Sequence, residues 1–250
     1  ISLGLVGSEM CIRDSSYAAR GGVRILEQER LATCGEAVYD RKNGKTTLRI
    51  NPEITDNGQV ITGSEIFLKY KEDVLQDIFI PKDARAIRPT NGTREWFEVV
   101  DGDTSTFTDS ASFVDDMTGS TLRGFFVDGS LDSLRLEGMA TTIYHLFEDS
   151  VYQGRNLVSG DTISMKFDNQ DLDHIFVNGG SRGTYIPDST NGEVDGPVTY
   201  SSEDIEYDIL NEFMNLHGEA DIKYTNVNLT AGFINMEWNN NLLKAIPQSK

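Results

Sequence analysis

The sequence contains few of the residues on which common catalytic and redox chemistries depend. Its 250 residues include three histidines, two cysteines and six prolines, and its 22 lysines and arginines are outnumbered by 40 aspartates and glutamates. A net charge of -18 excludes the basic surface that binds nucleic acid or an anionic membrane. No apolar run approaches the roughly 18 residues of a membrane-spanning helix. The chain therefore indicates an acidic globular protein, long enough to bury a sizeable core.

The first fifteen residues are expected to lie outside the natural fold. Residues 1–15 (ISLGLVGSEMCIRDS) resemble the conceptual translation of a sequencing adapter, and their charges follow the apolar part, which is the wrong order for a signal peptide. Without them Cys34 is the single cysteine, so cysteine usage does not indicate a compartment. The chain is expected to be cut at both ends, with any export signal missing.

Alternating apolar and polar residues predict an all-β body. Ile66, Leu68 and Tyr70 alternate with Phe67 and Lys69, which is the period-two pattern of strands. Asn-Gly and Asp-Gly pairs separate such runs and favour tight turns. Helical periodicity is scarce, and the best helical candidate is the short stretch 23–32 (VRILEQERLA).

An internal repeat organises these strands. Residues 60–80 (VITGSEIFLKYKEDVLQDIFI) align without gaps with residues 157–177 (LVSGDTISMKFDNQDLDHIFV), and a third copy begins near Leu229. A second element, residues 134–144, aligns with residues 214–224. Such a unit cannot bury its apolar face alone, so neighbouring units must stack. The small residues repeated within the second element are expected where backbones approach closely or the interior tapers, and they are Gly138, Ala140, Gly218 and Ala220.

Several motifs together resemble the OstA-like, organic-solvent-tolerance family. They are residues 125–132 (FFVDGSLD), 136–144 (LEGMATTIY), 160–163 (GDTI) and 179–187 (GGSRGTYIP). Residues 200–245 resemble the same module where it leads into the periplasmic N-terminal region of the outer-membrane lipopolysaccharide-assembly protein. On this basis residues 16–196 are expected to be jellyroll repeats with a polar insertion at about 90–113, and 197–250 a further, truncated repeat.

The resemblance implies an elongated, open β-jellyroll of stacked antiparallel strands, located in the periplasm and associated with the outer membrane. It also implies a non-enzymatic module for lipopolysaccharide transport that needs no cofactor or metal. Lipid A acyl chains would lie in an apolar groove, and other jellyroll modules would join end to end by strand pairing. If one face of each repeat strand points inward, the groove is lined by Ile66, Leu68, Tyr70, Ile163, Met165, Phe167, Ile234, Met236 and Trp238.

The same inward residues could equally fill a closed core, because period-two alternation identifies a buried face without showing how deep each side chain lies. A structural β-repeat surface or scaffold protein therefore remains the alternative function. Lys69 and Lys166, at matching repeat positions, are expected on the outer face.

Candidate catalytic and metal sites are sparse. No two histidines have metal-ligand spacing, and His145, His174 and His217 favour surface or turn positions. A stretch that begins at Asp101 hints at a calcium loop but lacks the glycine and the final glutamate of an EF-hand.

Two further motifs favour structural roles. The glycine-rich run 179–183 favours a hairpin loop over a phosphate cradle, since no helix is expected to follow it. Asp115 and Asp116 favour solvated charges at a strand end. A carbohydrate-active β-repeat enzyme would need a defined pair of carboxylates, and nothing in the sequence singles out such a pair, so this function is the least favoured.

Overall fold

The computed structural model describes residues 4–6, 9–13, 16–27, 29–56, 58–100, 103–168, 171–188, 196–237, 240 and 242–247. These ranges form nineteen strands joined in one sheet and contain no helical residue. The prediction of an all-β jellyroll is therefore confirmed. Within the same ranges, no helix has the length and apolar character needed to cross a membrane.

The strands are β1 (Gly4–Val6), β2 (Glu9–Arg13), β3 (Ser16–Glu27), β4 (Arg30–Asp40), β5 (Lys45–Arg49), β6 (Glu53–Asp56), β7 (Gln59–Thr62), β8 (Glu65–Lys71), β9 (Val74–Ile80), β10 (Ala84–Val100), β11 (Asp103–Gly119), β12 (Thr121–Val127), β13 (Ser130–Glu148), β14 (Val151–Asp168), β15 (Asp171–Pro187), β16 (Val198–Asp208), β17 (Phe213–Tyr224), β18 (Val227–Glu237) and β19 (Leu242–Ile246).

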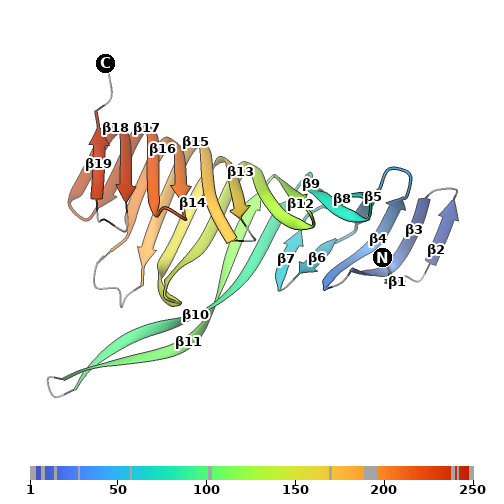
Figure 1. Cartoon of the computed structure of the whole chain (residues 1–250), viewed down its shortest axis with the longest axis horizontal. Helices are drawn as coiled ribbons and strands as arrows, with labels where there is room; N and C mark the ends of the chain where they lie inside the picture. The colour runs from blue at the N-terminus through green and yellow to red at the C-terminus, as the bar shows by residue number, and fades with distance from the viewer. Residues whose placement is uncertain are drawn as a thin grey trace.

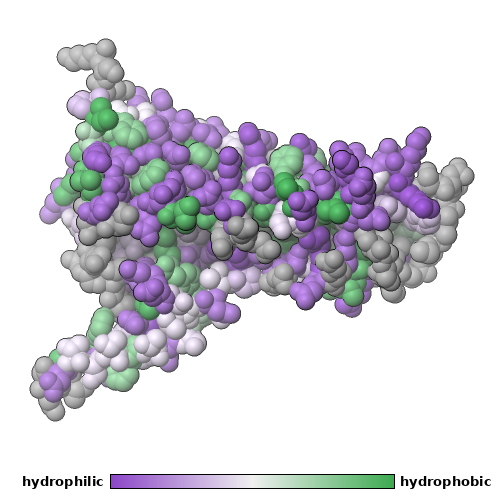
Figure 2. Space-filling model, in the orientation of Figure 1, coloured by the Kyte–Doolittle hydropathy of each residue, from purple (hydrophilic) through white to green (hydrophobic). Residues whose placement is uncertain are grey.

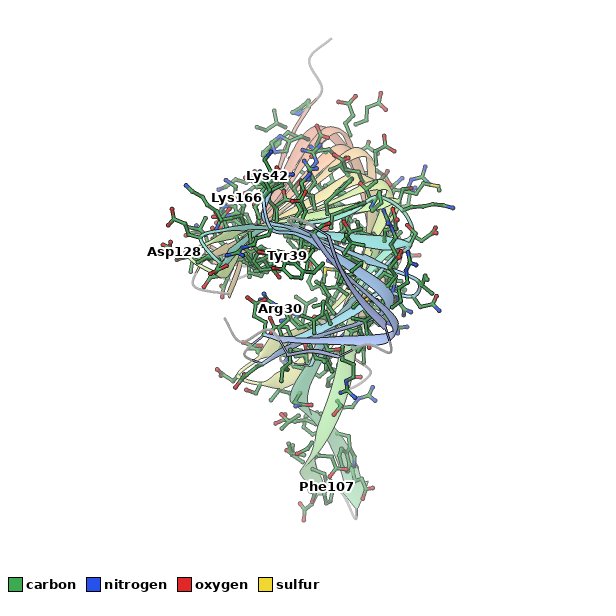
Figure 3. All side chains as sticks on the ribbon, turned by 90° about the vertical axis from the view of Figure 1, so that its right-hand side faces the viewer. Arg30, Tyr39, Lys42, Phe107, Asp128 and Lys166 are labelled. Atoms are coloured by element: carbon green, nitrogen blue, oxygen red, sulfur yellow. The ribbon has the colours of Figure 1, made fainter. Side chains whose placement is uncertain are left out.

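The sheet is folded lengthwise into two layers that share one corner (Figure 1). The upper layer contains β2, β5, β8, β9, β12 and β19, and the lower layer contains β1, β6, β7 and the base of the β10–β11 hairpin. Strands β3, β4 and β13 to β18 run through both layers, with a register shift midway along each pairing. Seen end-on, the two layers diverge from the corner and leave the opposite side open (Figure 3).

Left-handed backbone steps turn the strands at the corner. On β13, Gly138 (φ 77°) and Met139 (φ 52°) together oppose a single residue of β14, so the strand bulges and changes direction. On β17, Gly218 (φ 73°) and Glu219 (φ 46°) do the same against β18. Glycine takes this conformation without a Cβ penalty, which explains the glycine repeated at these two positions.

The internal repeat of the sequence is a repeat of structure. Gly63 and Gly160 both lie at the corner, and three residues later Ile66 and Ile163 are both fully buried. A row of fully buried side chains follows the corner along the length of the sheet. It comprises Leu48, Ile66, Ile80, Leu122, Leu136, Ile163, Val177, Ile205, Leu216 and Ile234.

Two local predictions are wrong. Residues 23–27 end β3 and residues 30–32 begin β4, where Val23 pairs with Cys34, because strand pairing outweighs a short helical periodicity. The glycine-rich run 179–183 is not a hairpin loop but lies within β15, where Gly179 and Gly180 form a corner step with φ 81° and 60°.

The expectation that residues 1–15 lie outside the fold finds no support. Their described parts form β1 and β2, and both strands pair antiparallel with β3. The division into domains at residue 196 stays a prediction, although β15 and β16 pair through both layers across it.

The polar insertion at about 90–113 forms a projecting arm made of the distal parts of β10 and β11 (Figures 1 and 2). Trp96 and Phe107 stack across its two strands, with their ring centroids 5.8 Å apart. The Arg94 guanidinium ties the arm to the buried carboxylate of Asp188, which follows β15. That ion pair raises the pKa of Arg94 further above its ordinary value.

Candidate functional site: a groove between the two layers

An open groove lies between the layers from β3 to β15. It holds two cavities of about 330 and 750 Å³, and both are lined in part by Glu27, Arg30, Ile54 and Asp73. Figure 3 shows Tyr39 of the upper layer and Arg30 of the lower layer on opposite sides of the opening. These volumes fall in the range of small-molecule binding sites.

The walls of the smaller cavity are predominantly apolar, and those of the larger cavity combine apolar and polar surface in nearly equal shares. From the upper layer come Leu68, Leu75, Ile78, Leu122, Leu134, Met165 and Phe167. From the lower layer come Ile25, Ala32, Ile54, Ile61, Ala86 and Met117. Both layers face the groove with one side of each strand, because alternate side chains point to opposite faces of a sheet.

The groove residues predicted from the sequence differ in depth. Ile66, Ile163 and Ile234 are fully buried at the corner and belong to the core. Two positions further along their strands, Leu68 and Met165 are 4% and 5% exposed and line the cavities.

At the next inward positions the side chains approach the mouth of the groove. Tyr70 and Phe167 are half-buried and line the first and second cavity respectively. Met236 is half-buried against the core, and Trp238 lies outside the described residues. Lys69 and Lys166 are exposed on the outer face of the same strands.

Two contacts cross the mouth of the groove. The hydroxyl of Tyr70, in the upper layer, donates a hydrogen bond to Glu27 Oε2 of the lower layer at 3.2 Å. Arg30 of the lower layer places its guanidinium carbon 5.9 Å from the ring centroid of Phe126 in the upper layer. Burial and the neighbouring Glu27 carboxylate raise the pKa of Tyr70, so its hydroxyl stays a neutral donor.

Charges of both signs flank the mouth, with acidic groups in excess. Arg30 is paired with Asp56, whose Oδ2 accepts from the guanidinium Nε at 3.0 Å and lies 2.9 Å from Nη2. The remaining carboxylates that line the two cavities are Glu27, Glu29, Asp73, Asp115 and Asp128. The mouth therefore offers no concentration of positive charge to an anionic ligand.

Asp115 anchors the lower wall, contrary to the prediction that it is a solvated charge. Its side chain is 3% exposed. One carboxylate oxygen accepts from the His145 main-chain N–H and contacts the ring Nδ1, each at 2.9 Å. The other accepts from Arg88 Nε and Nη2 at 3.0 and 2.6 Å. His145 is thus a partner in a buried cluster and not a surface residue.

A hydrogen-bonded cluster of tyrosines stands at the far end of the groove. Tyr200 donates to Asn156 Oδ1 at 2.6 Å, and its hydroxyl lies 2.8 Å from that of Tyr207. Asn156 Nδ2 donates in turn to the Tyr144 hydroxyl at 3.0 Å. We call these four residues the tyrosine barrier.

Three members of the tyrosine barrier are buried, and the fourth, Tyr144, is half-buried. Tyr200 and Tyr207 are 5% and 0% exposed, and burial raises their pKa values. Burial also raises the pKa of Tyr144, to about 12. Sequence reasoning missed these residues, because they come from three strands, β13, β14 and β16, and share no spacing pattern.

Asp173, His174 and Asp208 form a cluster whose ligand atoms lie within 4.8 Å of one another. His174 Nδ1 lies 2.9 Å from Asp173, and its Nε2 lies 3.1 Å from Asp208. A metal ion needs an unprotonated ring nitrogen, whereas both nitrogens here face carboxylates. The arrangement fits an imidazolium clamped between two carboxylates better than a metal site.

This clamp makes stability depend on pH. Burial alone would lower the pKa of His174, but hydrogen bonds and charge from Asp173 and Asp208 raise it overall. The stabilisation is therefore complete below about pH 6.5 and is lost as pH rises through the raised folded-state pKa. We expect His174→Gln to destabilise the protein by up to about 1 kcal/mol at acid pH. In urea titrations the difference in free energy of unfolding between the wild type and His174→Gln should shrink toward pH 9. A difference that does not change with pH would contradict the clamp.

The other predicted polar sites lie apart from the groove. His217 is exposed on β17, 3.8 Å from Glu206. Asp101 lies outside the described residues, and Asp103 and Asp109 are exposed on the projecting arm. Cys34 is a buried thiol whose pKa is raised by burial.

Comparisons with known proteins give limited similarity. No family model matches the chain, and no curated protein matches it. Among solved structures, the chain is similar to the crystal structure of LptH from Pseudomonas aeruginosa, described as the LptA-homologous periplasmic component of the conserved lipopolysaccharide transport device. The two share 12% sequence identity with a TM-score of 0.40, over 54% of this chain and 82% of that one.

Proposed function

We propose that this protein is a non-enzymatic binding module that holds the acyl chains of a lipopolysaccharide in the groove between its two layers. The observation that supports this proposal is the open groove, which has apolar side chains from both layers on its walls and charged residues at its mouth. An amphiphile fits this arrangement, because its chains would be buried while its head group stays in water.

Acyl burial provides the affinity in this proposal. Removing apolar surface from water contributes about 0.8 kcal/mol per methylene, so several buried methylenes suffice without polar recognition. Met165 and Met117 line the larger cavity, and methionine adapts its shape readily to different occupants. Among amphiphiles we propose lipopolysaccharide, because the sequence motifs resemble those of the OstA-like family.

The net charge of -18 does not attract an anionic head group. Binding therefore depends on the chains, and salt should strengthen it by screening the repulsion. A closed-core scaffold would leave no such groove. A carbohydrate-active enzyme would need two carboxylates facing each other across a sugar-sized cleft, and the Asp115 carboxylate is instead held by Arg88 and His145.

The two ends of the sheet suit a bridge between modules in the periplasm, next to the outer membrane. Among the described strands, β2 pairs with β3 alone and β19 with β18 alone, so each presents a free edge. The β19 edge carries exposed Leu242, Leu243 and Ile246. Another jellyroll module could add its own edge strand there by backbone pairing.

Site-specific crosslinking tests the proposed function. Photoreactive side chains placed at Leu68 and Met165, which line the groove, are expected to label bound lipopolysaccharide strongly. The matched controls are their sequence neighbours Lys69 and Lys166, which point outward and should label weakly. Equal labelling at the inner and outer positions would contradict the groove proposal.

A further inference from the structure

The tyrosine barrier lies where the groove stops. The last residues that line the larger cavity are Tyr144 in the lower layer and Ile175 in the upper layer. Tyr144 is itself a member of the barrier, and Ile175 pairs with Tyr207 on the adjacent strand. The barrier and the end of the groove therefore coincide in both layers.

The Tyr200 ring reaches its place because β15 has no side chain beneath it. Gly183 pairs directly with Tyr200, and a Cβ added at Gly183 would lie 2.0 Å from the Tyr200 ring. The ring crosses β15 over this glycine to reach Asn156 on β14. The close approach of the ring therefore requires glycine at position 183, because any larger residue would push the ring away from the β15 backbone.

The barrier closes the space between the layers. Tyr200 lies in the lower half of β16 and Tyr207 in its upper half, so their hydroxyl contact at 2.8 Å spans both layers. Buried hydroxyl and amide groups are tolerated in an apolar interior only when they are hydrogen-bonded, and these groups satisfy one another. Beyond them, Met214, Leu216 and Ile222 are buried core residues of β17.

We propose that the tyrosine barrier sets the length of acyl chain that the groove accepts, with the Tyr200 ring as the stop. This inference rests on the proposed function, since it concerns the same groove. A chain that grows along the groove gains burial until its end meets the Tyr200 ring. Further methylenes then remain in water and add no affinity. Asn156 acts as a positioning residue that holds the ring across the groove.

A chain-length series tests the stop. For saturated fatty acids from octanoate to stearate, the affinity of the wild type should rise about fourfold per methylene, equivalent to about 0.8 kcal/mol, and then reach a plateau. Tyr200→Ala removes the ring and should move the plateau to longer chains. Tyr200→Phe keeps the ring and should leave the plateau where it is.

The outcomes separate this inference from the proposed function. Absence of binding at every chain length would overturn both. Binding without a plateau, or a plateau at the same length in the wild type and in folded Tyr200→Ala, would overturn the barrier alone.

A measurement on the wild type covers the case in which Tyr200→Ala does not fold. A long fatty acid with a photoreactive terminal carbon should label Tyr144, Met165 or Ile175, on the groove side of the barrier. Labelling of Met214 or Ile222, on the far side, would contradict the stop.

Discussion

Replacing Asp115 with alanine is expected to lower the free energy of unfolding by about 1–3 kcal/mol, the usual cost of leaving buried hydrogen-bonding groups without their acceptor. The Asp115 side chain is 3% exposed. Its loss leaves the Arg88 charge and the His145 N–H without their acceptor. Both groups lie where the projecting arm leaves the lower layer, so the damage should include the base of the arm.

Urea unfolding followed by circular dichroism measures this effect. Asp116→Ala is the matched control, because Asp116 is the adjacent carboxylate and pairs with Arg85, whose side chain is 51% exposed. Exposed pairs contribute up to about 1 kcal/mol. Asp115→Asn keeps one acceptor oxygen, so its loss in free energy of unfolding should lie between those of Asp115→Ala and Asp116→Ala. Equal losses for Asp115→Ala and Asp116→Ala would show that the buried cluster is not an anchor.

Ile163→Ala and Phe167→Ala are expected to have different effects, because Ile163 is a core residue and Phe167 a groove residue of the same strand. Both residues point inward from β14, but Ile163 is fully buried at the corner while Phe167 is half-buried at the mouth. Ile163→Ala opens a cavity in a packed core and should cost about 2–5 kcal/mol of stability. Phe167→Ala removes a groove wall and should cost much less.

Ligand affinity should show the opposite order. Phe167→Ala is expected to weaken binding of a long-chain amphiphile about tenfold, equivalent to about 1.4 kcal/mol, because part of its contact surface is gone. Ile163→Ala should change affinity little in the fraction that remains folded. Calorimetric titration alongside urea unfolding gives both quantities. Similar stability losses for the two variants would indicate a closed core at both positions.

The strand pattern, the repeat and the corner glycines could be predicted from the sequence, because each depends on local chemistry. Period two specifies which face is buried, and Gly138 and Gly218 mark the left-handed steps. The depth of a side chain could not be predicted, since it depends on distance from the corner. Ile163, Met165 and Phe167 look alike in the pattern, yet they range from core to mouth.

The polar clusters escaped prediction because their partners are distant in sequence. Asp115 is separated from Arg88 by 27 residues and from His145 by 30. Tyr200 is separated from Asn156 by 44 residues. Nothing near Asp115 distinguishes it from the half-buried Asp116, and only the pairing of β10, β11 and β13 brings its partners together.

The most direct test of the groove is whether one acyl chain touches both layers at once. Intermolecular nuclear Overhauser effects can be measured between a bound fatty acid and methyl-labelled protein. We predict contacts from the chain to Ile54 and Ile61 in the lower layer and to Leu68 and Leu134 in the upper layer, but none to the exposed Ile50. Contacts confined to one layer, or to exposed methyl groups such as that of Ile50, would contradict a groove that holds acyl chains between the two layers.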